Sequence, residues 1–483
     1  MMQMRLLNLR NLTRRPFTTA NDISDISKAR IDKFKNQTHE LIEQVAEYHK
    51  NIASINVKPD AKRNFLRKLV SSTPPAEPVG WETIQAQIKD IIIPNNSHWQ
   101  HPMYMSWFPS ISTWPAIQGE ILSRSINAIG FSWDSSPLQT ELELLCADWY
   151  AQMMGFPDYF LHEKSPGGGM AMTSAGDSVL NLLIVARHRR NAKKPVIYVS
   201  DQTHVHISKC AKALGYETRV IPSYFDEISQ NYPMNVSLLP LAIKKDIEAG
   251  LDPIFACGTF GTTNSTAIDP IQQIGQICKE NNMWLHIDAA YAGSALVCPE
   301  FRHLFKGVEY ADSIVVNASK WMGLGFCASY MFIRDKKWLG DCFTMDPDYL
   351  RKSDDIDLGS LQLAFGRDNR ALRMFFYVSQ YGVSGVQSMI RKHVELAKIL
   401  ENLIKNDDRF EFCTKREFAL LVFRMKGDDQ KTTELIGKLK ERKDIFVLGT
   451  KLEGRPVIRL SMNSEYLEEE HIHRAWEIIA SLA

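Results

Sequence analysis

The sequence predicts an α/β protein with a mostly parallel central sheet, preceded by a helical segment and followed by a smaller α+β domain. Between residues 111 and 375, long helical patterns alternate with short runs rich in β-branched and aromatic residues, at 195–199, 253–257, 284–287 and 313–316. Such alternation is typical of parallel strands that are joined through helices. The predicted parts are therefore residues 21–110, 111–375 and 376–483.

The two flanking parts show different patterns. Apolar residues three and four positions apart predict helices over 26–51 and 81–91, and prolines among aromatic residues predict loops over 94–115. The C-terminal part predicts a helix, three strands and a last helix, at 383–405, 410–413, 419–424, 457–461 and 467–482.

Residues 1–20 differ in composition from the rest of the chain. They hold four arginines and no acid, with leucines at helical spacing followed by Thr18 and Thr19. A mitochondrial transit peptide and an ordinary basic tail both have this composition. We expect a cytoplasmic protein, with mitochondrial import as the alternative, and leave residues 1–20 out of the fold prediction.

The overall composition argues against several classes of partner. The chain carries 57 basic and 56 acidic side chains, so it has no excess charge for binding nucleic acid or an anionic membrane surface. No apolar run reaches the roughly 18 residues that a membrane span needs. The eight cysteines include no CxxC pair, which favours free thiols over disulfides or a zinc site. We therefore expect a small-molecule ligand and no metal.

Asp288 directly follows the apolar run 284–287. In open α/β sheets, ligands bind at the carboxyl ends of the strands, so Asp288 is expected beside a ligand. A buried carboxylate needs a partner, and the protonated ring nitrogen of a pyridine-type cofactor would provide one. The alternative is that Asp288 caps the next helix.

Lys320 follows the next predicted strand, in the segment 317–322. A lysine amine among apolar groups has a lowered pKa and can attack an aldehyde to form a Schiff base. The alternative is a lysine that extends into solvent from the end of a strand.

A run of glycines and hydroxyl residues at 166–178 precedes an apolar helix pattern. Backbone N–H groups and the helix dipole make such a helix start an anion site, and Ser174, Ala175 and Gly176 are the predicted phosphate-side residues. The run matches neither the dinucleotide fingerprint nor the Walker motif. A flexible loop before an N-capped helix is the alternative.

Two more predicted strands end in polar residues. His204 follows the strand 195–199, where an imidazole can stack on a flat ring or hydrogen-bond a carboxylate, although most single histidines are only structural. Thr263 lies in the segment 261–264 after another strand, which is equally well explained as a plain turn. Each pattern alone is weak, but all five follow strand ends, and together they predict one shared site.

From about residue 25 to its end, the chain resembles the group II pyridoxal-phosphate (PLP) decarboxylases, the family of aromatic L-amino acid, tyrosine and histidine decarboxylases. The stretches that carry this resemblance are 130–133, 136–137, 140–143, 286–294, 298–302, 307–313 and 319–321. The resemblance implies a fold of the aspartate-aminotransferase type (fold type I), with a mixed, mostly parallel seven-stranded sheet. It also implies a homodimer with the active site at the subunit interface and the N-terminal helical segment wrapped around the partner.

The resemblance also implies roles for individual residues. Lys320 corresponds to the lysine that binds PLP covalently, and Asp288 to the acid at the pyridine nitrogen. Ala290 and His204 correspond to the residues below and above the ring, and Tyr349 to the general acid on a mobile loop. The other cofactor-side positions are Ser174, Ala175, Gly176, Thr263, Asn317 and Ser319. The substrate-side positions are Trp99, Trp107, Phe108, Ser110, Phe131, His204 and Gly366.

The implied reaction removes the α-carboxylate of an aromatic L-amino acid such as dopa, 5-hydroxytryptophan, tyrosine or tryptophan. Two positions point to different substrates, so the identity of the amino acid stays open and histidine remains an alternative to the aromatic substrates. Ser319 stands where aromatic amino acid decarboxylases usually have His, and where histidine and animal tyrosine decarboxylases often have Ser. Gly366 points to the aromatic group, because histidine decarboxylases tend to have Ser there.

Two further departures concern the cofactor side and the loop. Gly176 and Asp177 replace the usual Ser-Glu pair, which removes one hydroxyl from the phosphate side. The loop between Tyr349 and Gly366 looks about three residues shorter than is usual in the family that the chain resembles.

Three other functions compete with this prediction. An aldehyde synthase on the same scaffold couples decarboxylation to oxidative deamination, usually after the loop tyrosine or the stacking histidine is replaced, but Tyr349 and His204 are retained. A non-enzymatic relative would lack Lys320 or Asp288. An aminotransferase would need a pair of arginines, for which Arg459 is the single candidate.

Overall fold

The computed structural model describes residues 20–345 and 356–483, with side chains described from residue 27 onward. The chain divides into two compact units. One consists of residues 59–97 together with the chain up to Ile55, and the other of residues 98–483 together with 56–58.

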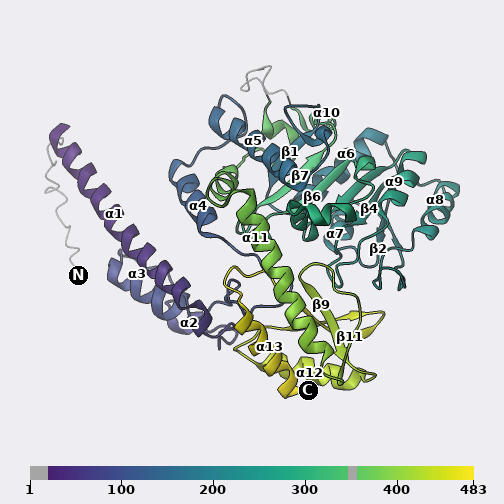
Figure 1. The fold of residues 1–483 in the computed structure, drawn as a ribbon. Helices are drawn as coiled ribbons and strands as arrows, with labels where there is room; N and C mark the ends of the chain where they lie inside the picture. The colour runs from purple at the N-terminus through teal and green to yellow at the C-terminus, as the bar shows by residue number, and fades with distance from the viewer. Residues whose placement is uncertain (1–19, 346–355) are drawn as a thin grey trace, which may run out of the picture. The chain divides into compact units, whose positions relative to one another are not determined.

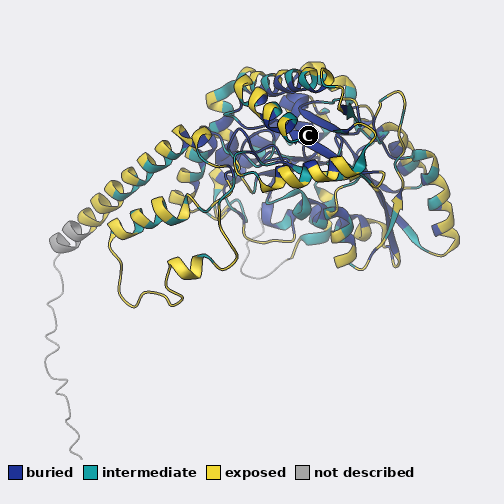
Figure 2. Cartoon of the chain, turned by 90° about the horizontal axis from the view of Figure 1, so that it is seen from below, coloured by how far each residue is buried: buried dark blue, intermediate teal, exposed yellow. Residues whose placement is uncertain are grey.

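The N-terminal unit is helical, as the 3–4 spacing of its apolar residues predicts. Its elements are α1 (Ala20–Lys50), η1 (Ile52–Ser54), α2 (Leu66–Leu69), α3 (Trp81–Gln87) and the π-helical turn η2 (Ile88–Ile92). Trp81 and Gln85 of α3 both donate side-chain hydrogen bonds to the Glu40 carboxylate on α1, which joins the two helices. Figure 2 shows α1 as largely exposed, with Ile31 and Phe34 among its exposed apolar residues.

The larger unit contains a seven-stranded sheet in the order β1-β7-β6-β5-β4-β2-β3 (Figure 1). Its strands are β1 (Gly168–Met172), β2 (Pro195–Ser200), β3 (Glu217–Ile221), β4 (Asp252–Thr259), β5 (Trp284–Asp288), β6 (Ser313–Asn317) and β7 (Ser329–Ile333). The strands from β6 to β3 pair in parallel, whereas β7 is antiparallel to both β6 and β1. The predicted mixed, mostly parallel seven-stranded sheet is confirmed.

Helices cover both faces of this sheet, which is why its central strands are almost continuously apolar. They are α5 (Pro137–Met154), α6 (Ala175–Arg190), α7 (His206–Ala213), α8 (Leu239–Glu248), α9 (Ile271–Glu280) and α10 (Lys337–Phe343), and α4 (Trp114–Ile126) precedes them in the chain. Short turns connect them, namely η3 (Asp158–Phe160), η4 (Val236–Leu238), η5 (Ala292–Val297), η6 (Pro299–Leu304), η7 (Val308–Tyr310) and η8 (Leu358–Leu361). The apolar residues of α6, α7 and α10 pack on one face, and those of α5, α8 and α9 on the other. Figure 2 shows the strands as the buried layer.

The long helix α11 (Ala371–Lys405) leads from the large sheet to a second, antiparallel sheet of four strands in the order β10-β11-β9-β8 (Figure 1). It bends at Gly382, whose φ of 61° interrupts the helical backbone and is readily adopted by glycine. The second sheet and its helices are β8 (Phe410–Phe412), β9 (Leu420–Met425), α12 (Asp429–Glu441), β10 (Leu448–Leu452), β11 (Arg455–Ser461) and α13 (Glu469–Leu482).

Within the described ranges, no helix is both long enough and apolar enough to cross a membrane.

Candidate active site

The carboxyl ends of five strands, β1, β2, β4, β5 and β6, lie at one edge of the large sheet, because these strands run in the same direction. A cavity of about 290 Å³ opens there. Its walls are formed by Phe108, Ser174, Ala175, Gly176, His204, His206, Thr259, Gly261, Thr263, Asp288, Ala290, Tyr291, Asn317 and Lys320. The structure thus brings together every predicted cofactor-side residue except Ser319, which lines the neighbouring cavity.

Asp288 is the last residue of β5 and is 3% exposed. Its Oδ1 accepts a hydrogen bond of 3.0 Å from the backbone N–H of Ala290. Burial opposes ionisation of this carboxyl, but the nearby His206, Lys320 and His286 outweigh burial and lower the pKa of Asp288. The cavity therefore holds a fixed negative charge at neutral pH.

Lys320 follows β6 in a tight turn in which its backbone N–H donates to the carbonyl of Asn317. Burial lowers the pKa of the Lys320 amine, an effect that Asp288 opposes and Arg459 reinforces. The Nζ atom lies 5.4 Å from the centre of the Phe108 ring. A lysine with a lowered pKa in an enclosed site is suited to attack a carbonyl group.

Ser174 caps α6, and its Oγ accepts a hydrogen bond of 3.1 Å from the backbone N–H of Asp177. The Asp177 carboxylate in turn accepts hydrogen bonds from the hydroxyl (2.6 Å) and the backbone N–H of Thr173. This turn holds the first residues of a 16-residue helix at the cavity, where its dipole favours an anion.

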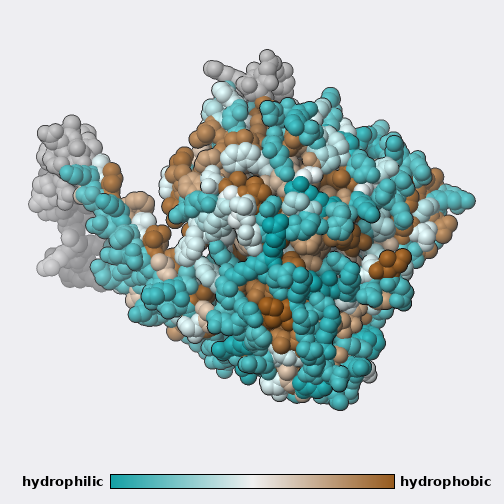
Figure 3. Space-filling view, in the orientation of Figure 1, coloured by the Kyte–Doolittle hydropathy of each residue, from teal (hydrophilic) through white to brown (hydrophobic). Residues whose placement is uncertain are grey.

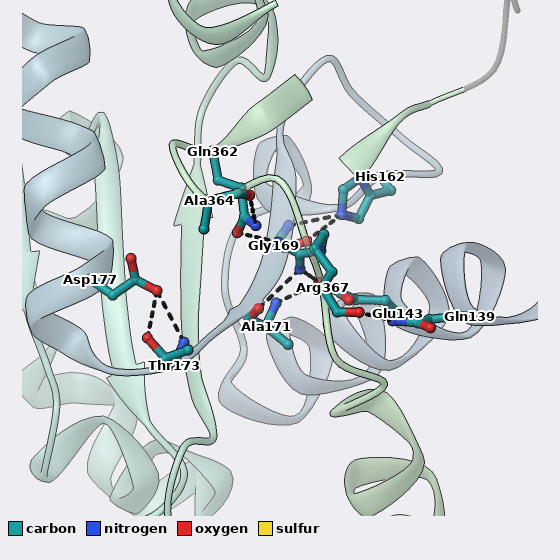
Figure 4. Close-up of polar contacts among 10 residues, drawn as sticks. All are labelled: Gln139, Glu143, His162, Gly169, Ala171, Thr173, Asp177, Gln362, Ala364 and Arg367. Atoms are coloured by element: carbon teal, nitrogen blue, oxygen red, sulfur yellow. Dashed lines mark hydrogen bonds and ion pairs between the residues drawn. The ribbon is translucent and has the colours of Figure 1, made fainter. Parts of the chain in front are cut away.

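A buried ion pair fixes β1, the strand that leads into this turn (Figure 4). Arg367 donates to Glu143 and to the carbonyl of Ala171, and Glu143 also accepts the backbone N–H of Ala171. Both charged side chains are 0% exposed. The segment that contains Arg367 is further linked to this region by the backbone N–H of Leu363, which donates to Asn181 on α6.

The sequence prediction missed His206, the first residue of α7, which lines the cavity beside the predicted His204. The Nδ1 atoms of the two imidazoles lie 2.7 Å apart. Burial lowers the pKa of both histidines, to about 4 for His206. His206 lies two positions after His204, a spacing that places side chains on one face of a strand but on different faces of a helix. Because His204 precedes α7 and His206 begins it, neither rule applies, and the spacing alone does not indicate that both rings face one cavity.

A second cavity, of about 470 Å³, adjoins the first, and Phe108, Asn317 and Lys320 line both. Its other walls come from Trp99, Gln100, Ser110, Ile111, Ser112, Ser319, Gly325 and Phe326. Trp99 stacks on Tyr104 and Trp107, and Phe108 stacks on Tyr291 at 3.7 Å. The walls are thus aromatic and apolar, with three serine hydroxyls among them.

Not all predicted substrate-side residues line these cavities. Trp107 contributes through its packing on Trp99 and through its carbonyl, which accepts a hydrogen bond from Arg459. Phe131 stacks on Phe365 at 4.7 Å and does not line either cavity, and neither does Gly366. Tyr349 lies outside the described residues. The predicted roles of Phe131, Gly366 and Tyr349 therefore remain predictions.

The residues of the first cavity fit a phosphorylated pyridine aldehyde. Lys320 supplies an amine for the aldehyde, Asp288 a buried carboxylate for a ring nitrogen, and the start of α6 backbone N–H groups for a phosphate. The Asp288 carboxylate has no cationic side chain bonded to it among the described residues, so its charge is free to pair with a ring cation.

Comparison with known proteins gives consistent matches along the chain. Residues 64–426 match the family model described as "Pyridoxal-dependent decarboxylase conserved domain". An aromatic-L-amino-acid decarboxylase from Cavia porcellus is 37% identical over 472 residues, which cover 93% of this chain and 97% of that protein.

Two solved structures share both fold and sequence with this chain. The Oryza sativa TDC with PLP and tryptamine superimposes with a TM-score of 0.90 at 31% identity, covering 93% of this chain and 97% of that one. A Rhodiola rosea 4-hydroxyphenylacetaldehyde synthase has a TM-score of 0.88 at 31% identity, covering 94% and 98% of the two chains.

Proposed function

We propose that this chain, which belongs to the pyridoxal-dependent decarboxylase family, removes the α-carboxylate of an aromatic L-amino acid and releases the amine and CO2. The observation that carries this proposal is the meeting of two cavities at Lys320. One contains the amine, carboxylate and helix start that suit PLP, and the other has aromatic walls of a size suited to a ring-bearing side chain.

When bound, PLP supplies an electron sink that accepts the electrons of the bond broken at Cα. We assign Lys320 to hold the cofactor covalently, and Asp288 to keep its ring nitrogen protonated. Ser174, Ala175 and the start of α6 would hold the phosphate, with Ala290 and His204 on the two sides of the ring. The lowered pKa of Lys320 favours its free amine, which is the form that releases and recaptures the cofactor.

The remaining residues orient the substrate and move a proton. We assign His204 to hold the α-carboxylate out of the ring plane, and Trp99, Phe108 and Ser110 to receive the side chain. Tyr349 is the residue we propose to deliver a proton to Cα after CO2 has left.

We also propose that the enzyme works as a homodimer. Figure 3 shows apolar residues gathered over α4 and α5, where Ile121, Ile126 and Leu138 are exposed. Phe326, on the rim of the substrate-side cavity, is 75% exposed. Phe131 and Gly366 do not line either of the two cavities described above, and we propose that a partner's copies of these residues complete the pocket.

The aldehyde synthase is the second candidate, because one of the similar structures is a 4-hydroxyphenylacetaldehyde synthase. His204 and Tyr349 favour the simple decarboxylase, since loss of either is the usual route to oxidative chemistry.

A substrate panel separates these functions. Purified enzyme with added PLP would receive dopa, 5-hydroxytryptophan, tyrosine, tryptophan, phenylalanine or histidine, with amine, aldehyde and peroxide measured by mass spectrometry and a peroxidase assay. We expect amine without peroxide from one or more of the aromatic substrates. Aldehyde with equimolar peroxide would instead establish the synthase, and amine from histidine alone would contradict the aromatic assignment.

A further inference from the structure

His206 has no part in the reaction as assigned above, yet its imidazole lines the cofactor-side cavity. It begins α7, and its Nδ1 lies 2.7 Å from Nδ1 of His204, which is hydrogen-bond distance. One of these two nitrogens must therefore carry the proton that lies between the rings.

A second contact decides which nitrogen carries it. The backbone N–H of His206 also donates to Nδ1 of His204, at 3.3 Å. A backbone N–H can only donate, so Nδ1 of His204 must offer a lone pair and cannot itself bear a proton. The shared proton therefore belongs to Nδ1 of His206.

The tautomer of His204 follows from this assignment. Burial lowers the pKa of His204, with Lys320 acting in the same direction and Asp288 opposing, so the ring is neutral near pH 7. A neutral imidazole carries one proton, and on His204 this proton must be on Nε2. Nε2 makes no hydrogen bond within the described parts of the chain, so its N–H is available to a ligand in the cavity.

We propose that His206 is a positioning residue that holds His204 as its Nε2–H tautomer and fixes the plane of its ring. The Nε2–H group then donates to the substrate carboxylate, and that last contact rests on the proposed function.

A histidine at position 206 lowers the stability of the fold, and packing alone does not explain why this residue type stands there. Its Nε2 atom is buried and has no hydrogen-bond partner among the described residues. An unsatisfied buried nitrogen is destabilising, and an apolar side chain would avoid this. A role of the Nδ1–H group toward His204 accounts for a histidine at this position.

The test uses two variants of the holoenzyme. In His206→Asn, the amide nitrogen replaces Nδ1 as donor, whereas His206→Leu keeps comparable volume without any donor. Magic-angle-spinning 15N NMR of histidine-labelled enzyme reports the protonation of each ring nitrogen, and His204→Gln identifies the His204 signals. We expect Nε2–H with a bare Nδ1 for His204 in the wild type and in His206→Asn. In His206→Leu the 2.7 Å side-chain contact is lost and only the longer backbone contact of 3.3 Å still favours a bare Nδ1, so we expect part of His204 to shift to the Nδ1–H tautomer.

Steady-state kinetics provide the second readout. We expect kcat to fall on the order of 10-fold in His206→Leu and to recover largely in His206→Asn, because misplacing a substrate-orienting group slows the chemical step. A proton on Nδ1 of His204 in the wild type would overturn the proposal even if the Leu variant failed to fold. An unchanged tautomer in a folded His206→Leu would also overturn it. The NMR measurement needs no substrate, so it stands apart from failure of the proposed reaction.

Discussion

The two cavities that meet at Lys320 are built from different kinds of structure. The cofactor-side cavity is formed at the ends of parallel strands and at the start of α6, where hydrogen bonds hold the side chains of Asp288 and Ser174. The substrate-side cavity is formed mainly by the loops around 99–112 and 319–326, and its hydroxyls at Ser110 and Ser112 make no hydrogen bonds among the described residues. The first is determined by the fold itself, whereas the second is free to vary without loss of the fold.

This contrast predicts that substitutions on the cofactor side abolish the reaction, whereas those on the substrate side change its selectivity. The largest effect is expected for Lys320→Ala, which removes the amine that we assign to hold PLP. We expect kcat to fall by at least about 10³-fold, because the covalent step has no replacement nucleophile. The visible absorbance of the bound cofactor would shift at the same time.

Lys337→Ala is the matched control for this variant. Lys337 lies on α10 with its side chain 71% exposed, and we expect wild-type activity and absorbance. Substantial amine production by Lys320→Ala, without added amines, would remove Lys320 from the mechanism.

The second prediction compares two buried carboxylates, each near the end of one of two neighbouring strands. Asp288 faces the cavity, whereas Asp269 accepts hydrogen bonds from the backbone N–H groups of Met234 and Thr259, and burial raises its pKa to about 6. We expect Asp288→Asn to lower kcat on the order of 10²-fold, because a neutral amide does not stabilise a protonated ring.

Asp269→Asn is expected to act on stability instead. It should lower the free energy of unfolding by about 1–3 kcal/mol, since the amide presents a donor to one of two backbone N–H groups, and leave kcat of the folded enzyme unchanged. Urea unfolding and steady-state kinetics on both variants separate the two roles. Equal kinetic defects in the two variants would mean that Asp288 is only structural.

The same contrast explains how much could be predicted from the sequence. Strand β5 and Asp288 were predictable because a buried parallel strand is mostly apolar, and the acidic residue that follows this run marks its carboxyl end, although His286 lies within it. The four strands predicted between 195 and 316 agree with β2, β4, β5 and β6 within about two residues at each end.

Other elements carried weaker local signals. Strand β1 begins in a glycine-rich run that predicts a loop, and only its pairing with β7 makes it a strand. The predicted C-terminal helix over 383–405 proved to be the second part of α11, since Gly382 separates two helical segments that the chain joins. Such pairing and joining depend on tertiary contacts, which periodicity does not report.

The buried ion pair was also beyond sequence reasoning, because Glu143 and Arg367 are 224 residues apart. The third prediction tests whether this ion pair keeps β1, and with it the cofactor-side cavity, in place (Figure 4). Glu143→Gln leaves the buried Arg367 charge without its partner, and we expect the free energy of unfolding to fall by about 3–5 kcal/mol.

An exposed ion pair provides the comparison for this variant. Asp341→Ala removes the pair between Lys337 and Asp341 on α10, whose side chains are 71% and 48% exposed, and should cost at most about 1 kcal/mol. Guanidinium unfolding monitored by fluorescence measures both. A loss below about 1 kcal/mol for Glu143→Gln would mean that the network around β1 does not depend on the ion pair.

The smallest effect is expected on the substrate side, for Ser110→Ala. The Ser110 hydroxyl faces the aromatic cavity and has no hydrogen-bond partner among the described residues, so it is free to bond a ring hydroxyl of the substrate. One such bond contributes about 0.5–1.5 kcal/mol, so we expect kcat/KM for a hydroxylated substrate such as dopa to fall about 2–10-fold. Phenylalanine serves as the internal control, because it offers no hydroxyl and its kcat/KM should stay unchanged. An equal loss of kcat/KM for both substrates would show that Ser110 shapes the cavity and does not bond the ring hydroxyl. Ser112 or Ser319 would then be the next hydroxyl to replace.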